Sequence, residues 1–204
     1  MSSQARKIFY GEYSFAVSRE VYEPAEDTFL LVNNLSVNEN EEVLDMGTGC
    51  GILAVLASEK ARKVVAVDIN PHAVTCAKRN AQLNGFATKI EVRLGNLFDA
   101  IATDEKFDLI LFNAPYLPTE NEKGDLIEMA WNGGRTGRRI IDQFIDNVSE
   151  YLVNKGRILL VQSNLSNLGK TLERFSRQNL QAGTIAERKV AFEKILLIEA
   201  RCNR

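Results

Sequence analysis

Short apolar and β-branched runs alternate with helical patterns from residue 43 onward. The runs that predict strands are VLDM at 43–46, VVAVD at 64–68, IEVRL at 90–94, FDLILFN at 107–113 and RILLVQ at 157–162. Alternation of this kind indicates a parallel sheet that helices cover on both faces. Two later runs, IAERKV at 185–190 and FEKILLIEA at 192–200, are too close together for a crossover helix. We therefore expect the sheet to end in an antiparallel pair.

Helix signals lie between the strand-like runs. Asn70 and Pro71 predict the start of one helix, and Gly85 predicts its end. Apolar side chains at helical spacing predict two further helices, each with one buried face. One stripe consists of Ile140, Ile141, Phe144, Ile145, Val148, Tyr151 and Leu152, and the other of Leu168, Leu172 and Phe175.

Two segments do not fit this simple alternation. Residues 1–42 precede the first predicted core strand, and residues 117–136 are too long for a plain connection between a strand and a helix. A chain of 204 residues corresponds to one domain, 1–204. We expect both segments to frame the functional site of that domain.

The composition is that of an ordinary globular protein and excludes several classes of function. Lys and Arg number 25 against 27 Asp and Glu, so no overall positive charge favours nucleic acid or an anionic membrane. Three cysteines without a CxxC pair and a single histidine, His72, predict neither a disulfide framework nor a metal site. Because no apolar run could span a membrane or act as a secretory signal, we expect a cytoplasmic protein.

A glycine-rich loop, DMGTGCG at 45–51, follows the first strand-like run and opens a helix. Backbone N–H groups at such a helix start face the ligand that binds there. The loop differs from the dinucleotide fingerprint GxGxxG, because its glycines lie at 47, 49 and 51 and Ile52 follows them. Asp45 would repel a pyrophosphate, but it would balance the charge of a cofactor with a cationic amino-acid group.

Asp68 ends the second strand-like run, where a carboxylate can accept hydrogen bonds from two ribose hydroxyl groups. Taken alone, the loop would be a tight turn and Asp68 a solvated acid. The combination of Asp45, the three glycines and Asp68 indicates S-adenosylmethionine as the cofactor. The sequence therefore favours a methyltransferase.

The fourth strand-like run ends in NAPYLP at 113–118, at the edge where open α/β sheets bind ligands. This segment resembles the NPPY motif of class I methyltransferases that act on planar amide or amino nitrogens, with Ala114 replacing the first proline. Such a nitrogen is a poor nucleophile because its lone pair is delocalised. The Asn113 side-chain oxygen and the Ala114 carbonyl can accept both of its N–H groups and stabilise the charge that it gains. Tyr116 would supply a stacking face. The structural alternative is a proline turn that closes a strand.

Two further segments, VYEPAEDTFLL at 21–31 and AWNGGRTGRRIIDQF at 130–144, extend this likeness. With them, the chain resembles the archaeal and eukaryotic branch of the HemK/PrmC-like glutamine methyltransferases. The resemblance implies the class I methyltransferase fold, a Rossmann-like, doubly wound α/β sheet of seven strands with an antiparallel last strand. It also implies transfer of a methyl group from S-adenosylmethionine to the side-chain amide of a protein glutamine, in the Gly-Gly-Gln motif of a class I peptide chain release factor.

The resemblance assigns roles to individual residues. Residues 1–42 would contribute to the cofactor and substrate site, and residues 117–136 would form a substrate-binding insert. The cofactor would be bound by Thr28, Asp45, Gly47, Gly49, Gly51, Asp68, Ile69, Asn96, Leu97 and Asn113. The catalytic segment would be Asn113, Ala114, Pro115 and Tyr116, and the substrate would contact Asn113, Pro115, Tyr116, Trp131, Gly133 and Gly134. Asn96 stands where Asp is common in the family, so its contact with adenine would lack a charged acceptor.

Several of these residues have a plainer interpretation. Thr28 can be a helix-start hydroxyl, Asp27 a first-turn acid and Trp131 a core aromatic. Cys50 is expected to be a small loop residue without nucleophilic function, and His72 is expected to face solvent.

Two other functions and one partner follow from the same observations. An adenine-N6 nucleic-acid methyltransferase would use the same motif, but it would need a basic surface or a target-recognition domain. The net charge is −2, and the insert carries the acids Glu120, Glu122, Asp125 and Glu128. A non-catalytic S-adenosylmethionine-binding subunit is the third alternative. Relatives in this branch work with a small zinc-binding activator, which we expect to add a strand to the run at 90–94, at the sheet edge.

Overall fold

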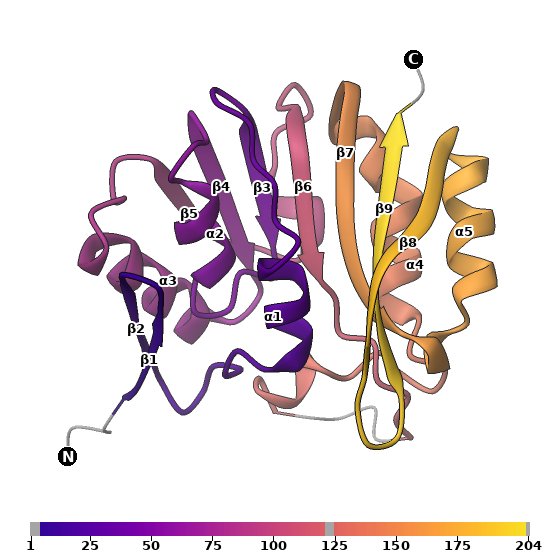
Figure 1. Cartoon of the computed structure of the whole chain (residues 1–204), viewed down its shortest axis with the longest axis horizontal. Helices are drawn as coiled ribbons and strands as arrows, with labels where there is room; N and C mark the ends of the chain where they lie inside the picture. The colour runs from indigo at the N-terminus through magenta and orange to yellow at the C-terminus, as the bar shows by residue number, and fades with distance from the viewer. Residues whose placement is uncertain (1–4, 121–124, 203–204) are drawn as a thin grey trace.

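The computed structural model describes residues 5–120 and 125–202 (Figure 1). Its strands are β1 (Arg6–Tyr10), β2 (Tyr13–Val17), β3 (Glu42–Met46), β4 (Lys63–Asp68), β5 (Ile90–Leu94), β6 (Phe107–Asn113), β7 (Leu152–Ser163), β8 (Leu180–Lys189) and β9 (Lys194–Cys202). Its α-helices are α1 (Glu26–Val32), α2 (Ile52–Ala57), α3 (Pro71–Leu83), α4 (Arg139–Val148) and α5 (Leu168–Arg177). Single 3₁₀ turns lie at Leu97–Ala100, Glu128–Ala130, Ser149–Tyr151 and Asn164–Ser166.

The large sheet has seven strands in the order β5-β4-β3-β6-β7-β9-β8. The first five are parallel, whereas β9 runs antiparallel to both β7 and β8. This arrangement confirms the predicted doubly wound sheet with an antiparallel last strand. It also confirms that β5 lies at the edge of the sheet.

Two details differ from the sequence prediction. The stripe that reaches Leu152 predicts one continuous helix, but α4 ends at Val148 and Leu152 begins β7, where it pairs with Phe107 of β6. The antiparallel hairpin β1–β2 was not predicted at all. Only its last residues, Phe15–Val17, are buried, so the hairpin lacks the apolar alternation of a core strand.

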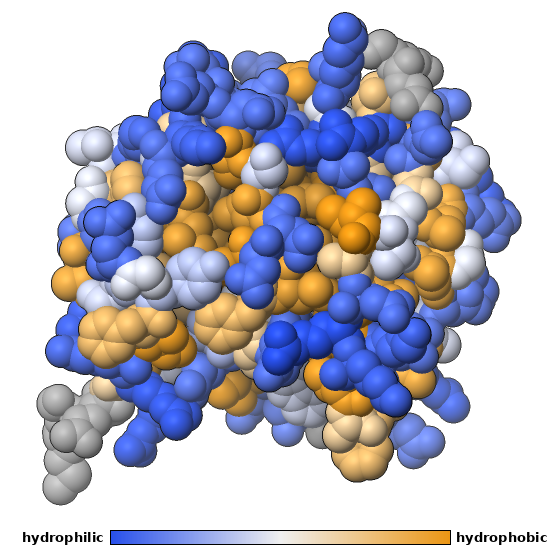
Figure 2. Space-filling view, in the orientation of Figure 1, coloured by the Kyte–Doolittle hydropathy of each residue, from blue (hydrophilic) through white to orange (hydrophobic). Residues whose placement is uncertain are grey.

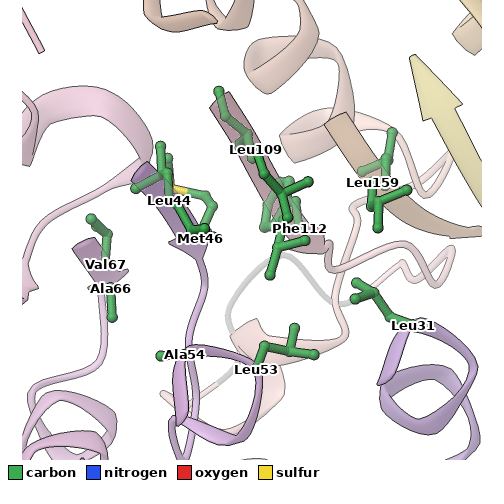
Figure 3. Packing of buried hydrophobic residues seen from close by; sticks show 14 of the residues in the cluster. Leu31, Leu44, Met46, Leu53, Ala54, Ala66, Val67, Leu109, Phe112 and Leu159 are labelled. Carbon is green, nitrogen blue, oxygen red and sulfur yellow. The ribbon is translucent and has the colours of Figure 1, made fainter. Parts of the chain in front are cut away.

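Helices cover both faces of the sheet. Helices α2 and α3 pack over β3, β4 and β5, whereas α4 and α5 pack together on the other face (Figure 1). Helix α1 contacts β6, β7, β9 and β8. Figure 3 shows Leu31 of α1 and Leu53 of α2 among the buried side chains Met46, Phe112 and Leu159 of the strands.

The surface mixes polar and apolar side chains. Figure 2 shows polar side chains around the rim of the face seen in Figure 1, with apolar surface gathered near its centre, over the region of β3 and β6. None of the helices in residues 5–120 and 125–202 combines the length and the apolar character that crossing a membrane requires.

Two asparagines, Asn80 in α3 and Asn84 directly after it, attach the β1–β2 hairpin to the body of the protein. The fully buried Asn80 accepts the Ala16 N–H at 2.9 Å and donates to the carbonyl groups of Ala16 at 3.1 Å and Cys50 at 2.8 Å. Asn84 bonds in the same way with Ser14, at 3.1 and 2.9 Å. The N-terminal segment and the glycine-rich loop are therefore held by one helix.

The carboxyl ends of the central strands lie side by side at one edge of the sheet. Met46 of β3 is paired with Val67 of β4 on one side and with Phe112 of β6 on the other. The chain reverses its direction of travel across the sheet between β3 and β6, which is the switch point where open α/β sheets bind ligands. Helix α1 lies at this same edge (Figure 1).

Candidate active site

An open cavity of about 1100 Å³, including the solvent at its mouth, lies at this edge of the sheet. Its walls come from the N-terminal segment, the glycine-rich loop, the ends of β4 and β6, and the segment that precedes α4. Nine of the sequence-predicted site residues line it: Thr28, Gly47, Gly49, Asp68, Ile69, Asn96, Leu97, Asn113 and Pro115. Segments far apart in the sequence therefore converge on one cavity.

The glycine-rich loop takes the left-handed backbone conformation at three positions, with φ of +67° at Gly47, +57° at Gly49 and +84° at Gly51. A Cβ atom at Gly51 would lie 3.1 Å from Ala77 of α3, so packing requires glycine there. A Cβ atom at Gly49 would meet open space instead. The loop backbone is therefore accessible to a ligand at Gly49, whereas Gly51 permits close contact between α2 and α3.

Asp45 is fully buried beneath this loop and does not line the cavity. Its Oδ2 accepts hydrogen bonds from the Thr48 hydroxyl at 2.6 Å and the Ala54 N–H at 3.1 Å. Its Oδ1 is buried without a hydrogen-bond partner. Burial raises the pKa of Asp45 to about 7, and the neighbouring charge of Asp68 acts in the same direction. One oxygen thus holds the loop, while the other is a buried acceptor that no donor of the described residues satisfies.

Asp68 connects the end of β4 to the same loop. Its Oδ1 accepts the Asn70 N–H at 2.9 Å, and its Oδ2 accepts the Gly49 N–H at 2.8 Å. Burial raises the pKa of Asp68, and the backbone hydrogen bonds oppose this rise. Each carboxylate oxygen has a second lone pair, so Asp68 can still accept hydrogen bonds from a ligand in the cavity.

Asn113 ends β6 and presents an amide with only one side engaged. Its Nδ2 donates to the Thr28 hydroxyl at 3.3 Å, whereas its Oδ1 is buried and has no partner. A buried acceptor without a donor is costly, and in a cavity wall it is a position where a substrate N–H can bind. This is the acceptor that the sequence predicts for an amide or amino group.

Asp27 is the residue that sequence reasoning underestimated. It lies in the first turn of α1, but it is only 5% exposed. Its carboxylate accepts hydrogen bonds from Tyr22 and Tyr116 hydroxyl groups and from the backbone and hydroxyl of Thr28. Burial, with the nearby charge of Asp27, raises the pKa of both tyrosines. The only sequence signal was the position of an acid directly before Thr28.

The remaining predicted residues lie beside the cavity without lining it. Ala114 and Tyr116 are 2% and 7% exposed, so the stacking role of Tyr116 stays a prediction. Trp131, Gly133 and Gly134 tie together the two ends of the insert. Gly133 donates to the Leu117 carbonyl at 2.9 Å, Trp131 accepts from the Leu117 N–H at 2.9 Å, and Gly134 accepts from the Thr119 N–H at 3.0 Å.

Other residues of the insert and its neighbourhood do line the cavity, although the sequence did not identify them. They are Tyr22, Leu126, Met129, Asn132, Arg139 and Ile140. Ile140 belongs to an apolar stripe that predicts a core face, so the sequence offered no indication that Ile140 lines the cavity. Glu122, one of the acids that argue against nucleic acid, lies outside the described residues.

The plainer interpretations of Cys50 and His72 are supported. Cys50 is buried, and burial raises the pKa of its thiol to about 12, which makes it a poor nucleophile. His72 is exposed at the start of α3, where its N–H donates to the Asn70 side chain. Within the described part of the chain, no group of three or more His, Cys, Asp or Glu side chains could hold a metal ion.

The chain is similar to known methyltransferases. The methyltransferase small domain family matches residues 23–190. MJ0928 of Methanocaldococcus jannaschii, which carries a provisional assignment as a protein N5-glutamine methyltransferase, is 42% identical over 184 residues, 89% of this chain and 91% of its own. Human methyltransferase HEMK2 is 32% identical over 203 residues, with 94% of each chain covered.

A solved structure with the same fold is that of Mtq2 from E. cuniculi in complex with Trm112, which is described as responsible for methylation of the eRF1 translation termination factor. It superimposes with a TM-score of 0.71 at 23% identity, over 90% of this chain and 99% of that chain. At this identity the superposition shows the shared fold.

Proposed function

The chain belongs to the methyltransferase small domain family, among its HemK-like glutamine methyltransferases, and on this premise we propose that it methylates a protein glutamine. The methyl group is transferred from S-adenosylmethionine to the side-chain amide nitrogen, in the Gly-Gly-Gln motif of a class I release factor. The observation that carries this proposal is the unpartnered Oδ1 of Asn113, in a wall of the cavity and at the start of the Asn-Ala-Pro-Tyr segment. Mtq2, which shares the fold, is described as acting on the termination factor eRF1.

The residues present fit S-adenosylmethionine. The unpartnered Oδ1 of Asp45 suits the cationic amino group, and Asp68 suits the ribose hydroxyl groups. Gly49 leaves the loop backbone open. The walls are completed by Thr28, Gly47, Ile69, Asn96 and Leu97. When bound, the cofactor supplies an electrophilic methyl group on its sulfonium.

The chain's own residues hold the accepting nitrogen. Asn113 Oδ1 and the Ala114 carbonyl accept the two N–H groups of the glutamine amide, and they stabilise the positive charge that the nitrogen gains. Pro115 limits the backbone on the far side of Ala114. No catalytic base is needed, because the nitrogen becomes acidic once it has accepted the methyl group and then loses its proton to solvent.

The segments 1–42 and 117–136 form the substrate side of a single methyltransferase domain, 1–204. The first contributes Tyr22 and Thr28 to the cavity wall, and the second contributes Leu126 and Met129. Because Tyr22, Thr28, Leu126 and Met129 line one cavity with Asn113, a glutamine side chain that reaches Asn113 passes between the described parts of the two segments.

The decisive experiment measures methyl transfer from labelled S-adenosylmethionine to three acceptors. These are a Gly-Gly-Gln peptide or an intact termination factor, the same substrate with leucine in place of the glutamine, and duplex DNA. We expect label only on the glutamine substrate. Transfer to it should depend only weakly on salt, whereas protein binding to nucleic-acid phosphates weakens on the order of 10³-fold between about 50 and 200 mM salt. Labelled DNA together with an unlabelled protein would contradict the proposal and support the adenine-N6 alternative. Cofactor binding without transfer to any acceptor would support the non-catalytic alternative.

We also propose a small activator subunit of the Trm112 kind, which binds zinc and docks on β5 by strand addition. Mtq2 is described in complex with Trm112, and β5 lies at the edge of the sheet here. Leu94 at the end of β5 is 57% exposed. An edge of this kind favours pairing with another chain.

The docking proposal is tested by co-purification of the two chains. Leu94→Asp should abolish co-purification with the activator and any gain in solubility that the activator gives to this chain. Leu165→Asp is the control, because Leu165 is 52% exposed and remote from β5. It should leave both unchanged. A purified chain that is monomeric, soluble and fully active without any partner would contradict the proposal.

A further inference from the structure

Asp27 accepts hydrogen bonds from Tyr22, Thr28 and Tyr116. Its Oδ1 accepts the Thr28 N–H at 2.6 Å and the Thr28 hydroxyl at 3.3 Å. Its Oδ2 accepts the Tyr22 hydroxyl at 3.2 Å and the Tyr116 hydroxyl at 3.3 Å. Two oxygens with four donors use all the acceptor positions that a carboxylate offers.

These hydrogen bonds impose a direction on the Thr28 hydroxyl. Since that hydroxyl donates its single proton to Asp27, its oxygen can act only as an acceptor toward Asn113. The Nδ2 of Asn113 is the donor at 3.3 Å. The amide of Asn113 is therefore fixed with its NH₂ group on the Thr28 side, and Oδ1 is the atom left without a partner.

We propose that Asp27 and Thr28 are positioning residues for the methyl transfer. The chain of hydrogen bonds from Asn113 to Thr28 and from Thr28 to Asp27 keeps the Asn113 amide in the one orientation that offers an acceptor to the substrate. This inference rests on the proposed function, because a glutamine amide or another NH₂ group needs an acceptor at this position. The opposite orientation would present an NH₂ group to an NH₂ group.

The same carboxylate anchors the other end of the catalytic segment. Tyr116 donates its hydroxyl to Asp27, and its carbonyl accepts the Ser166 hydroxyl at 2.7 Å. Residues 113 and 116 are thus held by two adjacent side chains of α1, Thr28 and Asp27, across 85 and 89 positions of sequence. Asp27 consequently sets the position of α1 relative to the whole segment.

The first test replaces the Thr28 hydroxyl with a methyl group of the same shape. In Thr28→Val we expect kcat to fall about 10- to 100-fold, because the buried Asn113 NH₂ loses its acceptor and turns toward the cavity. The KM for the glutamine substrate and the calorimetric Kd for S-adenosylmethionine should change less than threefold. Thr28→Ser should restore kcat. Asp27→Asn should lower kcat as well, whereas the exposed neighbour Glu26→Gln should leave it unchanged.

The second test uses non-additivity. If Thr28 acts through Asn113, then Thr28→Val should cause no further loss of kcat in an Asn113→Ala background. Multiplied losses, with a weakened cofactor Kd in both backgrounds, would show that Thr28 contacts only the cofactor and would overturn the inference. A lower unfolding temperature in Thr28→Val without rescue of kcat by Thr28→Ser would overturn it in favour of a structural role.

The third test does not depend on turnover. In the ¹⁵N spectrum of the intact chain, the side-chain NH₂ signals of Asn113, assigned by their absence in Asn113→Ala, should show slow hydrogen exchange that is lost in Thr28→Val. Unchanged exchange in Thr28→Val would overturn the inference. If the wild-type chain methylates no glutamine substrate, the proposed function fails, and this spectrum still decides whether Thr28 fixes the Asn113 amide.

Discussion

The raised pKa of Asp45 makes a quantitative prediction about stability. A tenfold difference in proton affinity corresponds to about 1.4 kcal/mol, so a rise from the ordinary 3.8 to about 7 corresponds to about 4 kcal/mol. Between these two pH values the folded protein holds a proton on Asp45 that the unfolded chain has released. The contribution is therefore fully present below about pH 4, and it is lost as the pH rises through 7.

The assay is urea unfolding of the ligand-free chain at a series of pH values, with Asp45→Asn as the matched control. Asparagine keeps the shape and can still accept from Thr48 and Ala54, but it does not titrate. From pH 5 to pH 8, the wild type should lose about 3 kcal/mol of unfolding free energy relative to the variant. Parallel pH profiles for the two proteins would refute the assignment of a buried, protonated Asp45.

Cofactor binding provides an independent measurement of the same group. A cationic amino group beside Asp45 favours the ionised carboxylate, so binding at pH 6 should release close to one proton. Calorimetric titrations in buffers of different ionisation enthalpy measure that proton. We expect none at pH 8.5, and none at either pH for Asp45→Asn. Proton release from the variant equal to that of the wild type would place the titrating group elsewhere.

Three further predictions concern the cavity and its loop. Asn113→Ala should lower turnover about 100- to 1,000-fold with little change in cofactor Kd, whereas Asp68→Ala should weaken cofactor binding about 10- to 100-fold. Calorimetry measures the cofactor Kd, and single-turnover experiments measure methyl transfer. Near-normal turnover of Asn113→Ala would contradict the proposed role of Asn113. Gly51→Ala should lower the free energy of unfolding, measured in urea, by roughly 2 to 4 kcal/mol, because backbone strain adds to overlap with α3. Gly85→Ala should lower it by only about 1 kcal/mol, because Gly85 has φ of +80° but open space around it. Equal losses would contradict the packing argument. Of the chain's three thiols, only that of Cys202 should react with a disulfide reagent in the folded state, and rapid reaction of a second one would refute the burial of the other two.

The strands and the cofactor loop were predictable because their causes are local. Runs such as those around Val43 and Ile110 are apolar throughout, as strands buried on both faces must be, and Asn70 with Pro71 carries its own helix-start signal. The glycines at 47, 49 and 51 all have positive φ values, a conformation that favours glycine. Among the nine predicted residues that line the cavity, Gly47, Gly49, Asp68, Asn113 and Pro115 follow from such local patterns. The family resemblance implied the other four, which are Thr28, Ile69, Asn96 and Leu97.

The residues that were missed act through contacts that no local pattern encodes. Asp27 was interpreted as an ordinary first-turn acid, because its two tyrosine partners come from different parts of the chain. The burial of Asp45 likewise depends on Thr48 and the start of α2 folding over it, and no local pattern indicates this burial. Short helices also carry weak signals: α1, from Glu26 to Val32, has too few turns for a clear stripe.

The attachment of the β1–β2 hairpin through Asn80 has a consequence for the order of folding. Ala16 and its partner Asn80 are separated by 64 residues, which a ribosome adds in roughly 3 to 13 s. A two-stranded hairpin is marginally stable by itself, so the first segment to be synthesised waits for α3 before it becomes ordered. Asn80 also donates to the carbonyl of Cys50 in the glycine-rich loop. In a growing chain, the folding of α3 therefore fixes the glycine-rich loop and the N-terminal segment together, although both are synthesised earlier.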